Sequence, residues 1–192
     1  MRTTALALLA LVPLCASLAP LPQQSPSSET SQQGRHATVI FLRHAEALPR
    51  TPANQNPILA DAGNKRAKLT AKTLRAAGVT RIFATELIRT QQTAAPLAKE
   101  LGIEVERYKA KDSRTFTRLL RQLKNGEVVV VVGHSNTLPV MVSELGGNLK
   151  GLDKKGYLPD TQHERMVVQF LSSHKATGPM RAMQTIDLRI GS

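Results

Sequence analysis

Apolar and polar positions follow one another along this chain in two kinds of pattern. Uncharged, mostly apolar runs at residues 37–42 and 128–132 are typical of β-strands that are covered on both faces. The second run is five consecutive valines, so we expect it at the centre of a sheet. Weaker strand patterns occur at residues 79–85, 103–108, 165–171 and 180–188.

Helical spacing of apolar side chains separates these strands. Residues 61–77 place alanine and leucine at every third or fourth position, and Gly78 follows their expected end. Within a second helical segment, Pro96 is expected to kink or restart the helix. The segment that contains Pro96 covers residues 87–101. Two further helical segments are predicted at residues 113–123 and 138–145. Strands that alternate with helices predict an α/β fold, a three-layer sandwich whose mostly parallel central sheet has helices on both faces.

Composition narrows the classes of partner. The 192 residues suit one domain with a single core, and 3% aromatic content means that Leu, Val, Ile and Ala must build that core. The formal net charge of +12 favours anionic partners. Because aromatic residues are few and basic residues are spread along the chain, we expect no nucleic-acid partner. The single cysteine excludes an internal disulfide and four-cysteine zinc sites.

The N-terminal segment differs from the rest. Residues 1–19 have a positive start, an apolar run and small residues after it, which together predict a secretory signal peptide cleaved within residues 15–24. The run is shorter than the roughly 20 apolar residues that span a bilayer, so a permanent membrane anchor is the weaker alternative. Residues 20–36 should be a flexible linker and residues 37–192 the folded domain. The mature protein is therefore expected to be periplasmic or secreted, with no stable membrane anchor.

Two histidines directly follow the two most apolar strands. His44 comes after Arg43, and His134 ends the valine-rich segment. Ligands of an open α/β sheet bind outside the carboxyl ends of its strands, so we expect both imidazoles in one site. Ser135 and Asn136 then lead into a helix whose N-terminal amides can bind an anion. An isolated histidine after a strand is more often an ordinary loop residue, but this combination favours a phosphate-like ligand.

Four segments occur in an order that resembles the histidine phosphatase superfamily, which has the phosphoglycerate-mutase-like fold. They are Leu-Arg-His-Ala-Glu at residues 42–46, the turn at 59–63, the Arg-led helix at 89–97 and Val-Val-Gly-His-Ser-Asn-Thr at 131–137. The similarity extends from about residue 37 to residue 172 and is greatest to a small secreted branch. Each segment alone is a weak signal, whereas four in series are a strong one.

The resemblance implies roles for the site residues. His44 is the nucleophile that becomes a phosphohistidine, and His134 is the second catalytic histidine. The phosphate-binding set that it implies is Arg43, Arg89, His134, Ser135 and Asn136. A nucleophilic imidazole must be neutral, with its other nitrogen hydrogen-bonded, and arginines suit the charge of a transferring phosphoryl group. No cofactor is then needed. A metal site at the histidines lacks a ligand spacing, and the arginines would repel a cation.

One expected group has no clear counterpart. Family members that cleave alcohol esters resemble a pattern with a Glu after the third strand, whereas residues 108–113 contain only Asp112. Asp112 is therefore the candidate proton donor, with Glu106 second, although Asp112 could equally serve to start the next helix. His163 belongs to a His-Glu-Arg segment at residues 163–165, before the last predicted strand, and the sequence assigns no role to these three residues.

The predicted function is a secreted, metal-independent phosphatase that hydrolyses phosphomonoesters or phosphoramidates through a phosphohistidine. Its partner would be a small phosphorylated substrate or a phosphorylated envelope sugar or protein. The compact loop at residues 50–57 should leave the site open. A phosphomutase is one alternative, and a non-catalytic anion-binding envelope protein on the same fold is another. Binding a polymer needs charge but no nucleophile, which argues against the second alternative.

Overall fold

The computed structural model describes residues 34–175 and 177–190. The predicted signal peptide and most of the predicted linker lie outside these residues. In the described part, the strands are β1 (Arg35–Arg43), β2 (Arg81–Thr85), β3 (Val105–Tyr108), β4 (Val128–Gly133), β5 (Arg165–Ser173) and β6 (Arg181–Arg189). The helices are α1 (Asp61–Leu74), α2 (Ile88–Leu101), the short 3₁₀ helix η1 (Ala110–Asp112), α3 (Ser113–Leu120) and α4 (Thr137–Glu144).

The strands form one mixed sheet with the order β3-β2-β4-β1-β5-β6. The neighbours from β3 to β1 run parallel, while β5 is antiparallel to β1 and β6 is antiparallel to β5. The valine strand β4 lies between β2 and β1, as its uninterrupted apolar sequence predicts. The α/β class and the mostly parallel sheet are thus confirmed, with an antiparallel pair at one edge.

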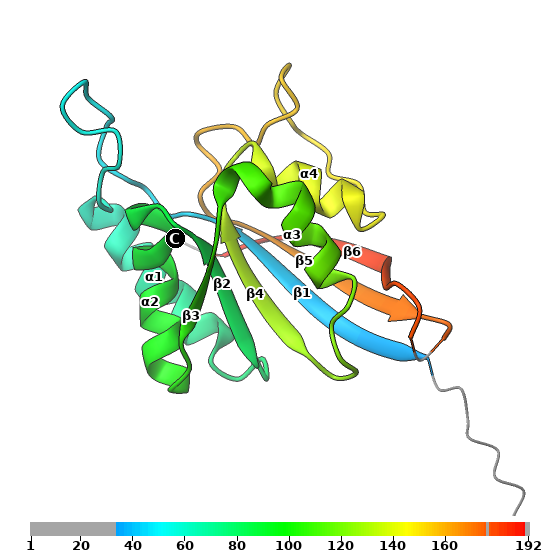
Figure 1. Cartoon of the computed structure of the whole chain (residues 1–192). Helices are drawn as coiled ribbons and strands as arrows, with labels where there is room; N and C mark the ends of the chain where they lie inside the picture. Colours follow the sequence, from blue (N-terminus) through cyan, green and yellow to red (C-terminus); the bar gives the residue numbers. More distant parts are fainter. Residues whose placement is uncertain (1–33, 176, 191–192) are drawn as a thin grey trace, which may run out of the picture. The chain divides into compact units, whose positions relative to one another are not determined.

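Helices cover the sheet on both faces, with α1 and α2 on one side and α3 and α4 on the other (Figure 1). Successive residues of β1 show why its sequence is apolar throughout. Val39 and Phe41 belong to the core cluster under α3 and α4, whereas Ile40 and Leu42 belong to the cluster under α1 and α2. A strand with both faces buried cannot alternate apolar with polar residues.

Several boundaries differ from the predicted ones. Helix α2 runs through Pro96 without a break, because its apolar face is buried against the sheet on both sides of the proline, at Ala94 and Leu97. It ends at Gly102, whose φ of 67° is the left-handed conformation that favours glycine. Strand β1 begins at Arg35, inside the predicted linker.

The carboxyl ends of β1, β4 and β2 meet at one edge of the sheet, and this arrangement positions the site. The His44 N–H donates to the Gly133 carbonyl at 2.9 Å, which joins the ends of β1 and β4. A Cβ atom on Gly133 would lie 3.0 Å from both Thr137 Oγ1 and the Tyr108 hydroxyl. Glycine therefore permits β4, the start of α4 and the Tyr108 side chain from β3 to pack closely at this point. In the described residues, no helix is both long and apolar enough to span a membrane.

Candidate active site

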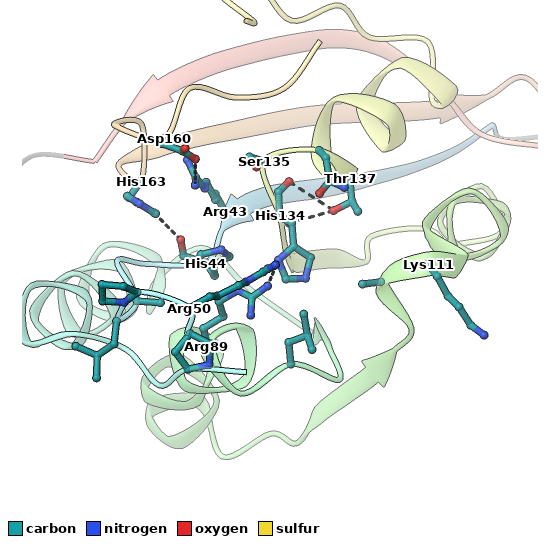
Figure 2. A pocket seen from close by; sticks show the side chains of 17 residues that line it. Arg43, His44, Arg50, Arg89, Lys111, His134, Ser135, Thr137, Asp160 and His163 are labelled. Carbon is teal, nitrogen blue, oxygen red and sulfur yellow. Dashed lines mark hydrogen bonds and ion pairs between the residues drawn. The ribbon is translucent and has the colours of Figure 1, made fainter. Parts of the chain in front are cut away.

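A cavity of about 660 Å³ opens at this edge of the sheet. Its walls come from the ends of β1 and β4, the start of α2, and the loops around residues 47–57, 110–111 and 160–163. Figure 2 shows His44, His134, Arg43 and Arg89 converging on it from these separate elements. Every site residue predicted from the sequence lines the cavity except the two candidate proton donors, Asp112 and Glu106.

The His44 imidazole is held in one orientation. Its Nδ1 is 2.8 Å from the Ala45 carbonyl oxygen. A carbonyl oxygen can only accept, so Nδ1 carries the hydrogen and Nε2 keeps its lone pair. The pKa of His44 is lowered to about 3, mainly by burial and also by the charges of Arg89, Arg43 and His163, while the hydrogen bond to Ala45 acts in the opposite direction. The ring is therefore neutral at neutral pH, with an available Nε2.

His134 lies beside it, with 5.4 Å between the ring centroids. Its Nε2 is 3.0 Å from Thr85 Oγ1, and its Nδ1 is 3.5 Å from Arg89 Nη2. Guanidinium only donates, so Nδ1 accepts and Nε2–H donates to Thr85. Thr85 can then donate to Thr90 at 2.8 Å, and Thr90 to the Leu87 carbonyl at 2.7 Å. Burial lowers the pKa of His134 to about 3, with smaller contributions from His44 and Arg89.

Arg89 is a buried cation that has no carboxylate partner in the described part of the chain. Arg89 is one of the most buried polar residues of the described structure, with only 3% of its surface exposed. Its Nη1 is buried and makes no hydrogen bond within the described residues. Burial, Arg50 and Arg43 all lower the pKa of its guanidinium. An unpaired buried charge is costly, so the site suits an anion that can accept from this guanidinium.

Arg43 differs in being held on two sides. Its Nη1 donates to the Pro159 carbonyl and its Nη2 to the Asp160 carboxylate, each at 2.8 Å. Its buried Nε has no partner in the described structure. Asp160 is 94% exposed at the cavity rim, so it does not cancel the positive charge deeper in the cavity.

The carboxylates predicted as proton donors are not in the cavity. Helix η1 places Ala110 and Lys111 along the wall, while Asp112 is exposed at its end and immediately precedes α3, without a side-chain cap hydrogen bond to it. Glu106 lies on the edge strand β3, where it pairs with Arg81 at 2.7 Å. Among the described residues that line the cavity, Asp160 is the only carboxylate. The same residues hold no group of three His, Cys, Asp or Glu side chains suited to a metal ion.

The structure adds polar residues to the site that the sequence did not assign: Arg50, Lys111, Thr137, Asp160 and His163. Arg50, Asp160 and His163 lie on irregular segments, whose course no periodic pattern predicts, and Lys111 lies in the three-residue helix η1. His163 Nδ1 is 2.9 Å from the main-chain oxygen of His44, and the two rings are 5.7 Å apart between centroids. The only sequence signal for His163 is its place in a His-Glu-Arg segment just before β5.

Comparison with known proteins gives a match to one family model over part of the chain and a shared fold. The model of the histidine phosphatase superfamily (branch 1) matches residues 39–112, which include Arg43, His44 and Arg89. No curated protein matches the chain.

Several solved structures share the fold at low identity. One, designated phosphohistidine phosphatase SixA from Agrobacterium tumefaciens, has 20% identity and a TM-score of 0.57 over 78% of this chain and 97% of its own. A protein histidine phosphatase SixA complexed with tungstate has 15% identity and a TM-score of 0.53 over 78% and 96%. A mycobacterial glucosyl-3-phosphoglycerate phosphatase complexed with VO3 has 14% identity and a TM-score of 0.54 over 77% and 97%.

Proposed function

We propose that this chain is a phosphatase of the histidine phosphatase superfamily that works through a phosphohistidine formed on His44. The observation that carries the proposal is the pairing of two unusual groups in one cavity. His44 presents a neutral Nε2, and Arg89 presents a buried guanidinium whose Nη1 makes no hydrogen bond within the described residues. A nucleophile beside an unpaired cation suits attack on a phosphoryl group.

The reaction has two steps. In the first, His44 Nε2 attacks phosphorus, the bond to the leaving atom breaks, and its electron pair departs with the leaving group. In the second, water attacks the phosphohistidine and the electron pair of the N–P bond returns to Nε2. Arg43 and Arg89 line the cavity beside His44, so they can bind the equatorial oxygens of the phosphoryl group, and positioning and electrostatics would supply most of the catalysis.

Substrates that need little help from an acid suit this cavity best. Its only carboxylate in the described residues, Asp160, is held by Arg43 at the rim. We therefore expect aryl phosphates and phosphoramidates to react faster than alkyl phosphates at neutral pH. A protein designated phosphohistidine phosphatase is among those that share the fold. The natural partner in this proposal is a small phosphorylated substrate or a phosphorylated sugar or protein of the cell envelope.

The location and the metal independence are part of the same proposal. The N-terminal pattern supports export and cleavage within residues 15–24. Mass spectrometry of the mature N-terminus tests this cleavage, and an intact Met1 would contradict export. Metal independence rests on the positive charge of Arg43 and Arg89, which opposes a cation in the cavity.

Hydrolysis of p-nitrophenyl phosphate in the presence of EDTA tests the activity. Arg89→Ala should lower kcat/KM by about 10²- to 10³-fold and weaken inhibition by vanadate, and Arg89→Lys should restore only part, because lysine lacks the planar fork. Arg75→Ala, which removes an exposed arginine at the end of α1, is the matched control and should behave as the wild type. Vanadate inhibition that is unchanged in Arg89→Ala, or activity lost with EDTA, contradicts the proposal. Oxyanion binding without turnover would instead indicate a non-catalytic protein.

A further inference from the structure

We propose that His163 is the proton-transfer residue of this cavity. Its Nε2 would protonate the leaving atom as His44 attacks phosphorus, and would then accept a proton from the water that hydrolyses the phosphohistidine. The inference rests on the proposed phosphatase reaction and gives to His163 the role that the sequence assigned to Asp112.

The hydrogen bonding of His163 leaves its Nε2 available. The ring lines the cavity, and its Nδ1 lies 2.9 Å from the His44 carbonyl oxygen (Figure 2). That oxygen can only accept, so Nδ1 carries the hydrogen and Nε2 is the nitrogen that can gain or lose a proton. No described residue makes a hydrogen bond to this Nε2. With 5.7 Å between the centroids of the two rings, His44 and His163 thus present two unpartnered Nε2 atoms to one cavity.

The segment that carries His163 is fixed to the cavity wall. The Leu158 N–H donates to the Ser135 carbonyl at 2.9 Å, and the Pro159 carbonyl accepts from Arg43 at 2.8 Å. These bonds join the segment to the ends of β4 and β1, the two strands that position His134 and His44. The position of the His163 ring is therefore set by the same framework as the nucleophile.

The other titratable groups along the described cavity wall are engaged or directed elsewhere. Both ring nitrogens of His134 have partners, in Thr85 and Arg89. The Asp160 carboxylate accepts from Arg43. Figure 2 shows the Lys111 side chain directed away from the histidines. His163 is then the remaining described group on the wall that can both give and take a proton.

The charges around His163 determine the pH at which it can act as a donor. Burial lowers its pKa, and Arg43 on β1 and Arg66 on α1 lower it further, whereas its bond to His44 and the nearby Glu46 raise it. The imidazolium therefore forms on the acid side of the ordinary histidine range. Donation to a leaving group should become effective as the pH falls, while the neutral ring can accept a proton from water at neutral pH.

The two steps balance around this ring. In the first, the P–O bond to the leaving group breaks, and the proton on His163 Nε2 moves to that oxygen, which yields an alcohol and a neutral ring. In the second, the water oxygen bonds to phosphorus, its proton moves to His163 Nε2, and the N–P bond electrons return to His44. The cycle ends with inorganic phosphate and the original protonation state.

Two substitutions separate proton transfer from positioning. In His163→Asn, the side-chain amide can donate in place of Nδ1 to the His44 carbonyl, but there is no group equivalent to a titrating Nε2. In His163→Ala, both functions are lost. His36→Asn is the matched control, since His36 is exposed and lies at the opposite end of β1 from the cavity. The readout is kcat/KM for an alkyl phosphate divided by that for p-nitrophenyl phosphate, measured across about pH 5 to 8.

The two phosphate groups ionise at different pH values, so each variant is compared with the wild type at the same pH, which cancels that ionisation. In His163→Asn and His163→Ala the ratio should lie about 10²- to 10⁴-fold below that of the wild type at the acid end, and the deficit should shrink as the pH rises, because p-nitrophenolate leaves without an acid. His163→Asn should retain most of its activity on p-nitrophenyl phosphate, which also reports that the variant is folded, and His36→Asn should match the wild type.

If His163→Asn has the same ratio of alkyl to aryl phosphate turnover as the wild type, the inference is overturned and His163 is a positioning residue. This holds whether or not His163→Ala loses activity on both substrates. Equal losses on both substrates in His163→Asn also overturn it. These outcomes differ from failure of the proposed function, in which the wild type hydrolyses neither substrate and no phosphoryl group is found on His44. In that case the assignment of His163 fails together with the function.

Discussion

Burial has opposite consequences for the two kinds of basic residue in this cavity. Desolvation lowers the pKa of both His44 and His134 to about 3, which keeps the two imidazoles neutral. Arginine retains its charge even when buried, so Arg89 brings a cation to the same place. Burial therefore keeps the histidine nucleophile neutral but leaves the neighbouring arginine charged, so a neutral nucleophile lies beside a permanent cation.

The lowered histidine pKa values predict a pH-dependent stability. The unfolded chain takes up protons on these histidines as the pH falls through about 6.5, whereas the folded chain does so only near 3. The free energy of unfolding should thus fall between these pH values, by at most about 1.4 kcal/mol per pH unit for each histidine. Urea denaturation at about pH 7 and pH 5 measures it.

The variant His44→Asn should show a smaller loss of stability over this pH interval, because it lacks one of the two imidazoles that become protonated only when the chain unfolds. His36→Asn, which changes an exposed histidine, serves as the control and should keep the wild-type dependence. A pH dependence that is identical in His44→Asn and the wild type would mean that His44 is not held neutral by the fold.

Elements with strong periodicity could be predicted from the sequence, and short or irregular ones could not. The valine strand β4 and the helix α1 are set by local patterns of burial, which appear directly in the order of residues. Helix η1 has three residues, too few for a period, and it determines that Lys111 and not Asp112 lies on the cavity wall. Pro96 is expected to kink or restart α2, and the helix does not restart there, because packing against the sheet outweighs one missing hydrogen bond.

Gly63 offers a test of how α1 supports the site. A Cβ atom on this residue would lie 2.0 Å from the main-chain oxygen of Glu46, which also accepts from the Ala60 N–H at 2.9 Å. Gly63→Ala must therefore displace the loop that follows His44. We expect a loss of about 1 to 3 kcal/mol in the free energy of unfolding, measured with urea, together with reduced phosphatase activity.

Asn64→Ala is the matched control, because Asn64 is the exposed neighbour of Gly63 on the same helix. It should change the free energy of unfolding by less than about 0.5 kcal/mol. If Gly63→Ala is as stable and as active as Asn64→Ala, the contact between α1 and the loop after His44 does not constrain the site.

At the scale of the whole molecule, the parallel part of the sheet brings the distant motifs together. His44 and His134 are 90 positions apart in the sequence, yet both follow strands that end at one edge. This convergence was predictable because parallel strands share the direction of their carboxyl ends. The contribution of His163 was not, because it depends on how an irregular segment crosses that edge before the antiparallel strand β5.

The central claim is that His44 carries the phosphoryl group during turnover. Rapid quenching of a reaction with a radiolabelled aryl phosphate into alkali tests it most directly, since phosphohistidine survives base and is lost in acid. The wild type should yield an alkali-stable, acid-labile label on the peptide that contains His44, and His44→Ala should yield neither label nor activity. His134→Ala should form the label more slowly, because it keeps the attacking Nε2 of His44 but removes the imidazole that accepts from Arg89 and helps to position it. A label that persists in His44→Ala, or full wild-type turnover with no label at any time, would contradict the account.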